Sequence, residues 1–273
     1  MEKYSVCYIG NMYQIAEDII FHDKLNLELI FTEKGKVSDE LLTLSFIHNI
    51  KLIEINEPSE IVKYVKKIDF AVMCSYGRKI PTKLLSSLKI YNIHYGMLPD
   101  YKGRHPSFYA FLNNEKFLGI SLHEVDENID TGRLISIYKI ENRLKTSERE
   151  VFQLQTEYAR KILDDLLCFL ENPKYISFEG GGNYYSPVSK KLTMVDIEVD
   201  SVLNILNKVK AQARYGGPEI IFGNTRYIVK YSTLTKDDYM SYKKITSNIY
   251  FDRDKFYILK EDVILKLTCE KIV

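Results

Sequence analysis

Residues 91–134 read YNIHYGMLPDYKGRHPSFYAFLNNEKFLGISLHEVDENIDTGRL, and the interpretation of the whole chain depends on them. The segment begins with a short strand that ends at His94, and a polar loop follows. A helix is predicted over residues 106–114, and a second strand is predicted over residues 118–125. An acidic loop over residues 126–132 closes the segment.

Three polar side chains of this segment can meet at one place. Because side chains alternate along a strand, Asn92 and His94 should project from the same face at the end of the first strand. Asp130 lies in the loop after the second strand and can reach the same position. Taken alone, such a histidine is usually structural, and an aspartate before Thr-Gly is usually a turn residue. The three together indicate a catalytic site.

Composition limits the possible functions. The 273 residues, of which 45% are hydrophobic, can form one large core or a core with an appendage. The formal net charge is +1, far from the basic balance typical of a nucleic-acid-binding domain. Four scattered cysteines form no Cys-x-x-Cys pair, so we expect no structural zinc. Without a signal-peptide pattern or a long apolar run, the sequence predicts a cytoplasmic protein with no membrane span.

In the first 94 residues, apolar strand patterns alternate with short helical patterns. This order predicts an α/β fold with a Rossmann-like, mostly parallel open sheet and helices on both faces. Ligands bind such sheets beyond the carboxyl ends of the strands, where Asn92 and His94 lie. The first strand is followed by Gly10-Asn11-Met12-Tyr13, which matches neither GxGxxG nor GxxxxGK[ST]. The predicted fold therefore does not imply a nicotinamide cofactor.

Beyond Pro218 the pattern changes to short β-rich segments. We therefore predict a catalytic domain over residues 1–200 and a small β-rich domain over residues 201–273. The apolar strand pattern at residues 263–269 needs a partner face, so the small domain is expected to contribute dimer contacts or to cover a nucleotide.

The motifs of residues 91–134 resemble the catalytic core of the folate-dependent formyltransferases. They are Asn92-x-His94, Leu98-Pro99-x-Tyr101-x-Gly103 and Asp126-x-x-Ile129-Asp130-Thr131-Gly132. The resemblance extends loosely over the first 190 residues, with Tyr185-x-Pro187 as a weaker echo. It implies that Asn92, His94 and Asp130 are catalytic, that N10-formyltetrahydrofolate is the formyl donor, and that no metal takes part.

The chemistry of formyl transfer suits these residue types. Attack of a neutral amine on a formyl carbonyl develops an oxyanion, to which the amide of Asn92 can donate. An imidazole can move a proton near neutral pH, and a neighbouring carboxylate can orient the ring or take the proton itself. The sequence leaves open whether His94 or Asp130 is the general base.

Within this family, Tyr101-Lys102-Gly103-Arg104-His105-Pro106 resembles the enzymes that formylate amino sugars carried on nucleotides. The resemblance implies a dTDP-linked 3-amino-3,6-dideoxyhexose as acceptor, formylated before its transfer into a surface polysaccharide. Three alternatives stay open: a 4-amino nucleotide sugar as acceptor, a formyltetrahydrofolate hydrolase, and a non-catalytic nucleotide-sugar binding protein. We expect a homodimer that binds neither nucleic acid nor membrane.

A nucleotide sugar requires cations for its diphosphate and flat groups for its base. The predicted substrate-binding residues are Tyr76, Arg78, Lys79, Lys102, Arg104, His105, Tyr184, Arg214, Tyr215 and Phe222. By resemblance, the donor site comprises Met73, Ser75, Ile80, Tyr95, Met97, Leu98, Asp126 and Ile129. We predict His22, His48 and His123 to be structural.

Overall fold

The computed structural model describes residues 3–177, 181–238 and 240–272. The chain divides into two compact units, and the first comprises Met1–Gly103, Gly119–Ile140 and Phe152–Tyr184. The second comprises Arg104–Leu118, Glu141–Val151 and Tyr185–Val273. Each unit combines three separate stretches of the chain. The division into two domains at residue 200 stays a prediction.

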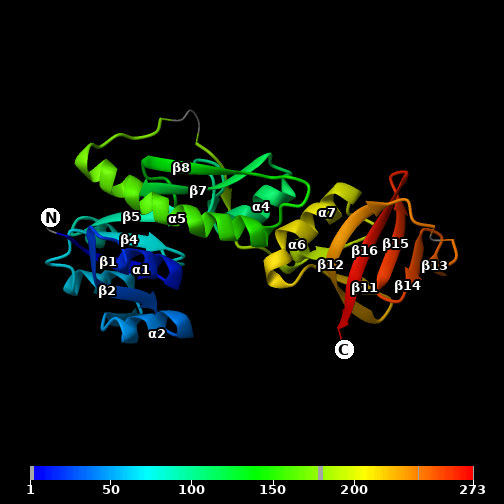
Figure 1. Cartoon of the computed structure of the whole chain (residues 1–273), viewed down its shortest axis with the longest axis horizontal. Coiled ribbons are helices and arrows are strands. Elements are labelled where there is room, and N and C mark those ends of the chain that lie inside the picture. Colours follow the sequence, from blue (N-terminus) through cyan, green and yellow to red (C-terminus); the bar gives the residue numbers. More distant parts are fainter. Residues whose placement is uncertain (1–2, 178–180, 239, 273) are drawn as a thin grey trace. The chain divides into compact units, whose positions relative to one another are not determined.

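A seven-stranded sheet with the order β3-β2-β1-β4-β5-β7-β8 organises the first unit (Figure 1). The five strands from β3 to β5 run parallel, and β7 pairs with β5 in the antiparallel direction. This arrangement confirms the predicted α/β, mostly parallel fold. The strands are β1 (Tyr4–Gly10), β2 (Leu25–Glu33), β3 (Lys51–Ile55), β4 (Phe70–Cys74), β5 (Lys89–His94), β7 (Phe117–Glu124) and β8 (Leu134–Glu141).

Helices cover both faces of this sheet because its strands are apolar on both sides. In β1, Val6 and Tyr8 enter one core cluster with α1, α2 and α5, whereas Cys7 and Ile9 enter another with η1 and the residues around α3. The alternation follows the strand period of two. The helices of the chain up to residue 171 are α1 (Tyr13–Ile20), α2 (Asp39–Ile47), η1 (Pro58–Lys63), α3 (Thr82–Leu85), α4 (Pro106–Leu112) and α5 (Glu148–Glu171).

The second unit contains a second seven-stranded sheet, with the order β10-β11-β12-β16-β15-β14-β13. Its pairings from β11 to β13 are antiparallel, which confirms the β-rich carboxyl-terminal part of the predicted fold. Ile205 and Val209 of helix α7 (Val202–Ala211) belong to the core cluster of this sheet. The strands are β10 (Met194–Val195), β11 (Glu219–Phe222), β12 (Thr225–Thr235), β13 (Lys243–Thr246), β14 (Ile249–Asp252), β15 (Lys255–Lys260) and β16 (Val263–Ile272).

The remaining elements are short. Strands β6 (Lys102–Gly103) and β9 (Tyr184–Tyr185) form a separate pair, and α6 (Lys190–Thr193) and η2 (Ala213–Tyr215) are single turns. Within the described ranges, no helix has the length and apolar character needed to cross a membrane. The same residues contain no group of three or more His, Cys, Asp or Glu side chains that could hold a metal ion.

Candidate active site

The register of β5 and β7 places four polar side chains on one face of the sheet. Asn92 lies directly opposite His123, and His94 lies opposite Ser121. The intervening residues of both strands, among them Ile93 and Leu122, enter the core on the other face. Because residues opposite each other in an antiparallel pair have neighbouring side chains, this register brings the two histidines and Asn92 together.

The loop after β7 presents Asp130 to this face. The carboxylate of Asp126 accepts hydrogen bonds from the Asn128 amide at 3.0 Å and from the Thr131 hydroxyl at 2.7 Å, which closes the loop. Asp130 itself has a φ of 53°, a left-handed conformation that aspartate tolerates better than most residues. At Gly132, a Cβ atom would overlap the backbone carbonyl of Glu124, so only glycine lets the loop approach β7 this closely.

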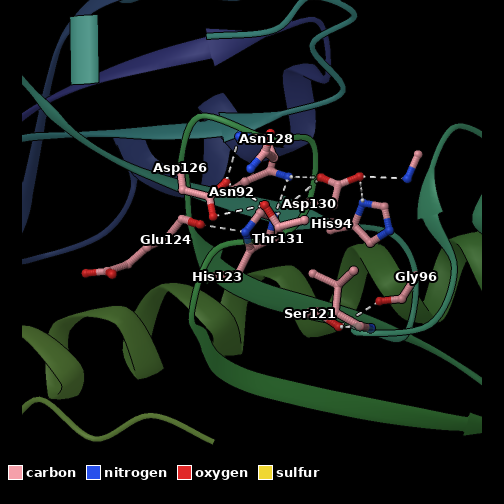
Figure 2. A network of polar contacts seen from close by, with 12 residues as sticks. Asn92, His94, Gly96, Ser121, His123, Glu124, Asp126, Asn128, Asp130 and Thr131 are labelled. Atoms are coloured by element: carbon pink, nitrogen blue, oxygen red, sulfur yellow. Dashed lines mark hydrogen bonds and ion pairs between the residues drawn. The ribbon is translucent and has the colours of Figure 1, made fainter. Parts of the chain in front are cut away.

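Asp130 lies at the centre of the resulting network (Figure 2). One carboxylate oxygen, Oδ1, is 3.4 Å from Asn92 Nδ2 and 3.6 Å from His123 Nε2. The other, Oδ2, accepts a hydrogen bond from the Gly103 amide at 2.8 Å and lies 3.6 Å from His94 Nδ1. All three predicted catalytic side chains therefore lie in one cluster, and each is largely buried.

His94 is held in one tautomer by the backbone. Its Nε2 lies 2.9 Å from the carbonyl oxygen of Tyr101, and a carbonyl can only accept, so Nε2 carries a hydrogen. In the neutral ring the lone pair is then on Nδ1, the atom that faces Asp130. Burial lowers the pKa of His94, an effect that the nearby Asp130 carboxylate only partly opposes. The ring is therefore a neutral proton acceptor at neutral pH.

Asp130 stays ionised in this setting. Burial by itself would raise the pKa of its carboxyl group, but the two histidines and the Gly103 amide outweigh that effect. The pKa falls from its ordinary 3.8 to about 2. A carboxylate of such low basicity is a poor general base, and it is well suited to stabilise a positive charge on His94.

The loop after β5 is attached to the same face. The Ser121 hydroxyl donates to the Gly96 carbonyl at 2.7 Å and accepts from the Leu98 amide at 3.1 Å. Gln155 of α5 donates to the Tyr95 carbonyl at 3.0 Å. The predicted donor-site residues of this loop are Tyr95, Met97 and Leu98, and these contacts fix its backbone beside His94.

A cavity of about 260 Å³ opens beside Asp126 in the first unit. Apolar side chains of Leu85, Leu88 and Ile90 form part of its wall, and Glu127 lies beside Asp126 in its lining. Of the other predicted donor-site residues, Met73 and Ile80 are buried in the core, whereas Ser75 is exposed with a φ of 53° and Ile129 is 44% exposed.

One of the two predicted cations near β4, Arg78, already has carboxylate partners. Arg78 lies 3.4 Å from a Glu33 carboxylate oxygen and 3.1 Å from Glu57, and Lys36 also pairs with Glu33 at 2.6 Å. Lys79 is exposed. The hydroxyl of Tyr76 is buried and has no hydrogen-bond partner among the described residues, as expected of a group that meets a ligand.

The other predicted substrate contacts are spread over both units. In the first unit, the Lys102 ammonium group hydrogen-bonds the Gly181 carbonyl, and Tyr184 is 54% exposed. In the second unit, Phe222 stacks on Phe256 with ring centroids 4.1 Å apart, inside the sheet's aromatic cluster. The second unit also contains exposed Arg104 and His105, together with Arg214 and Tyr215 at residues 213–215.

His123 is the residue of this network that the sequence did not identify. It is only 2% exposed, its Nε2 lies 2.9 Å from Asn92 Nδ2, and its Nδ1 lies 2.7 Å from the Glu124 carbonyl. The sequence predicts a structural role for it. The available signal was strand alternation, which puts His123 on the polar side of residues 118–125, but the pairing with β5 was needed to place it beside Asn92.

Several known proteins are similar in sequence to this chain. A family model for formyl transferases matches residues 52–164. The methionyl-tRNA formyltransferase of Sulfurimonas denitrificans is 27% identical over 217 residues, which cover 74% of this chain and 71% of that protein. The corresponding protein of Mesoplasma florum is 25% identical over 256 residues, 84% of this chain and 79% of its own.

Three solved structures share the fold. WlaRD, a sugar 3N-formyl transferase solved with dTDP and 5-N-formyl-THF, is 20% identical with a TM-score of 0.73, and the match covers 100% of both chains. An N-formyltransferase from Helicobacter canadensis, in complex with folinic acid and dTDP-3-aminofucose, is 21% identical with a TM-score of 0.72, over 99% of this chain and 100% of that one. A 4-N formyltransferase from Francisella tularensis is 21% identical with a TM-score of 0.67, over 80% and 93%. The residues that match the formyl transferase family model, 52–164, contain the whole polar network.

Proposed function

We propose that this chain is an N-formyltransferase that moves a formyl group from N10-formyltetrahydrofolate to the amine of a dTDP-linked 3-amino-3,6-dideoxy sugar. The observation that carries the proposal is the cluster of Asn92, His94 and Asp130 at the carboxyl end of β5. It combines a hydrogen-bond donor, a neutral proton acceptor and an ionised carboxylate, which together meet the needs of acyl transfer to an amine.

Each of the three residues has a separate task. Asn92 donates an N–H to the formyl oxygen as negative charge develops there, a contribution usually worth about 10²–10³ in rate. His94 takes the proton of the attacking amine on Nδ1, because that atom has the lone pair. Asp130 then stabilises the protonated ring from 3.6 Å. When bound, the donor would supply the electrophilic formyl carbon. The bond between that carbon and N10 of the donor breaks as the bond to the amine is completed, and His94 returns the proton to N10 of the departing tetrahydrofolate.

The cavity beside Asp126 fits the donor's pterin end. A pterin is flat and carries several N–H donors along one edge, so it needs apolar walls and acceptor oxygens. Apolar walls come from Leu85, Leu88 and Ile90, and acceptor oxygens come from the carboxylates of Asp126 and Glu127. The cavity opens at the loop that carries Asp130, and donor and catalytic residues would therefore share one loop.

Two lines of support favour a nucleotide sugar as the acceptor. WlaRD and the Helicobacter canadensis enzyme, solved with dTDP and with dTDP-3-aminofucose, resemble this chain over essentially its full length. The net charge of +1 also gives little attraction for a polyanion as large as tRNA. Methionyl-tRNA is the second candidate, because the similar curated proteins of Sulfurimonas and Mesoplasma are methionyl-tRNA formyltransferases.

One assay separates these candidates. The protein is incubated with N10-formyltetrahydrofolate and, in parallel, with dTDP-3-amino and dTDP-4-amino sugars, UDP-amino sugars and initiator methionyl-tRNA. Mass spectrometry should show one added formyl group on the 3-amino sugar. Formylation of the tRNA alone would replace the proposal with the second candidate, and release of free formate without an acceptor would indicate a hydrolase.

We further propose that the protein acts as a homodimer in the cytoplasm. The second sheet, which ends in the edge strand β13, offers an edge that a second copy can pair with. Multi-angle light scattering should give twice the mass of the chain at micromolar concentration, and a monomeric mass would contradict this part of the proposal.

A further inference from the structure

We infer that His123 is a positioning residue: it holds the Asn92 side-chain amide so that one N–H of that amide stays available to the reacting formyl group. The inference rests on the proposed function and adds a residue to its machinery. It also assigns a task to a histidine that is only 2% exposed.

The hydrogen bonds of His123 determine where its proton lies. Its Nδ1 is 2.7 Å from the backbone carbonyl oxygen of Glu124, which can only accept, so Nδ1 is the protonated nitrogen. In the neutral ring, Nε2 then has only a lone pair to offer. That lone pair faces Asn92 Nδ2 at 2.9 Å and accepts one of its two hydrogens.

This contact determines which way the Asn92 amide points. With the amide turned over, Oδ1 would face the lone pair of His123 Nε2 and, on its other side, the ionised carboxylate of Asp130. Both contacts would be repulsive. His123 and Asp130 therefore act together to keep the NH₂ group of Asn92, and not its carbonyl oxygen, facing them.

The two hydrogens of Asn92 Nδ2 are held unequally. The bond to His123 is short, at 2.9 Å, whereas the contact with Asp130 is 3.4 Å and close to the limit for a hydrogen bond. One hydrogen thus anchors the amide. The other remains available to shift toward a stronger acceptor, such as a formyl oxygen that gains negative charge, and a donor fixed in advance needs little reorganisation for this step.

Burial and register make the anchor rigid. His123 and Asn92 are 2% and 6% exposed and lie directly opposite each other in the β5–β7 pair. Neither side chain can turn away without breaking this packing. Where a supporting contact is lost, small displacements of a catalytic group can cost about 10²-fold in rate.

The test is a double-mutant cycle. His123→Leu fills the site without an acceptor, and it should lower kcat by about 10- to 100-fold while KM for both substrates stays nearly constant. His123→Gln restores an acceptor at the position of Nε2 and should recover a large part of kcat. In an Asn92→Ala background, His123→Leu should change kcat by less than about twofold, because its effect passes through Asn92. Equal losses in both backgrounds would overturn the inference, provided that thermal melts show every variant folded.

A second measurement tests the contact without any turnover. In protein labelled with ¹⁵N in histidine and asparagine, NMR should show His123 with a protonated Nδ1 and an unprotonated Nε2. His123→Leu should shift the Asn92 side-chain amide resonances. A protonated Nε2 in the neutral ring would rule out the hydrogen bond from Asn92 to His123, even if the enzyme is active. If NMR shows the contact but no acceptor is formylated, the proposed function fails and the catalytic role of His123 fails with it.

Discussion

Nδ1 of His94 lies 3.6 Å from a carboxylate oxygen of Asp130, while Nε2 of the same ring donates to the Tyr101 carbonyl at 2.9 Å. The hydrogen bond to the Tyr101 carbonyl therefore selects the tautomer of His94, and the Asp130 carboxylate lies beside Nδ1, the atom that will accept a proton. Transfer of a proton to Nδ1 converts a neutral ring beside an anion into an ion pair, which is why the two residues form one functional unit.

The first prediction concerns the titration of His94. Since burial lowers its pKa below the ordinary 6.5, the ring should remain neutral until the pH falls below that value. An NMR titration of the His94 ring should therefore give a midpoint below 6.5. The acid limb of kcat/KM, which reports the free enzyme, should lie in the same range. A midpoint above 6.5 would mean that Asp130 dominates over burial, contrary to the expectation.

The second prediction concerns Asp130 and acid stability. Its pKa is lower in the folded chain, at about 2, than its ordinary 3.8, so its ionised form stabilises the fold above pH 3.8 and this contribution is lost as the pH falls toward 2. The difference corresponds to about 2 kcal/mol. Asp130→Asn should lack this part of the pH dependence of unfolding free energy. Asp164→Asn removes an exposed carboxylate and should retain it.

Strands β1 and β4 of the first unit were predictable because they are almost wholly buried. Both are nearly continuous apolar runs, as expected of strands covered on both faces of the sheet. β8 was not predicted. Its Leu134, Ile135 and Ile140 are buried while Lys139 is exposed, so the strand shows neither a clean alternation nor a continuous apolar run.

The residues of the candidate site also differ in whether the sequence alone could place them. Asn92 and His94 could be paired from the strand period alone, and Asp130 from the motif of the loop that carries it. His123 could not be placed, because its position depends on the register between β5 and β7, which are separated by a loop and a helix. Nor does the sequence reveal that Arg78 pairs with Glu33, 45 residues away, since that contact exists only in the folded chain.

The third prediction concerns Asn92. Asn92→Ala should lower kcat by about 10²–10³ because it removes the donor to the developing oxyanion, while KM changes little. The fold should survive, although the buried Nε2 of His123 loses its partner and some stability with it. Steady-state kinetics by mass spectrometry provides the measurement. Asn26→Ala, at an exposed position of β2, is the matched control and should leave turnover unchanged. Near-normal turnover of Asn92→Ala would remove this residue from the mechanism.

The fourth prediction concerns the carboxylate of Glu33 at the end of β2. It is 4% exposed and accepts from the Gly77 amide at 2.9 Å, from Lys36 at 2.6 Å and from Arg78 at 3.4 Å. Although burial alone would raise its pKa, these donors together lower it. Glu33→Gln leaves the donors without a charged acceptor and should reduce the unfolding free energy by about 1–3 kcal/mol.

Urea denaturation measures this loss, and Glu57 offers the control. It is the other carboxylate partner of Arg78, but its side chain is 69% exposed. Glu57→Gln should therefore change the unfolding free energy by no more than about 0.5 kcal/mol. Equal effects of the two substitutions would show that the buried contacts of Glu33 add nothing to stability beyond an exposed pair.

The last prediction concerns the position of the amine on the sugar. We expect kcat/KM for a dTDP-3-amino-3,6-dideoxy sugar to exceed that for the corresponding 4-amino sugar. The attacking nitrogen must approach both the formyl carbon and His94 Nδ1, and moving the amine by one ring carbon requires a different tilt of the sugar while the diphosphate stays in place. A site shaped for one tilt holds the other amine away from its attack position, and such misplacement lowers the rate of transfer. The two substrates should be compared at equal nucleotide concentration with saturating donor, so that the ratio reports transition-state stabilisation alone. A tenfold preference corresponds to about 1.4 kcal/mol. If the 4-amino sugar is preferred by that factor, the assigned ring position is wrong, whereas formyl transfer to a nucleotide sugar by Asn92, His94 and Asp130 still holds.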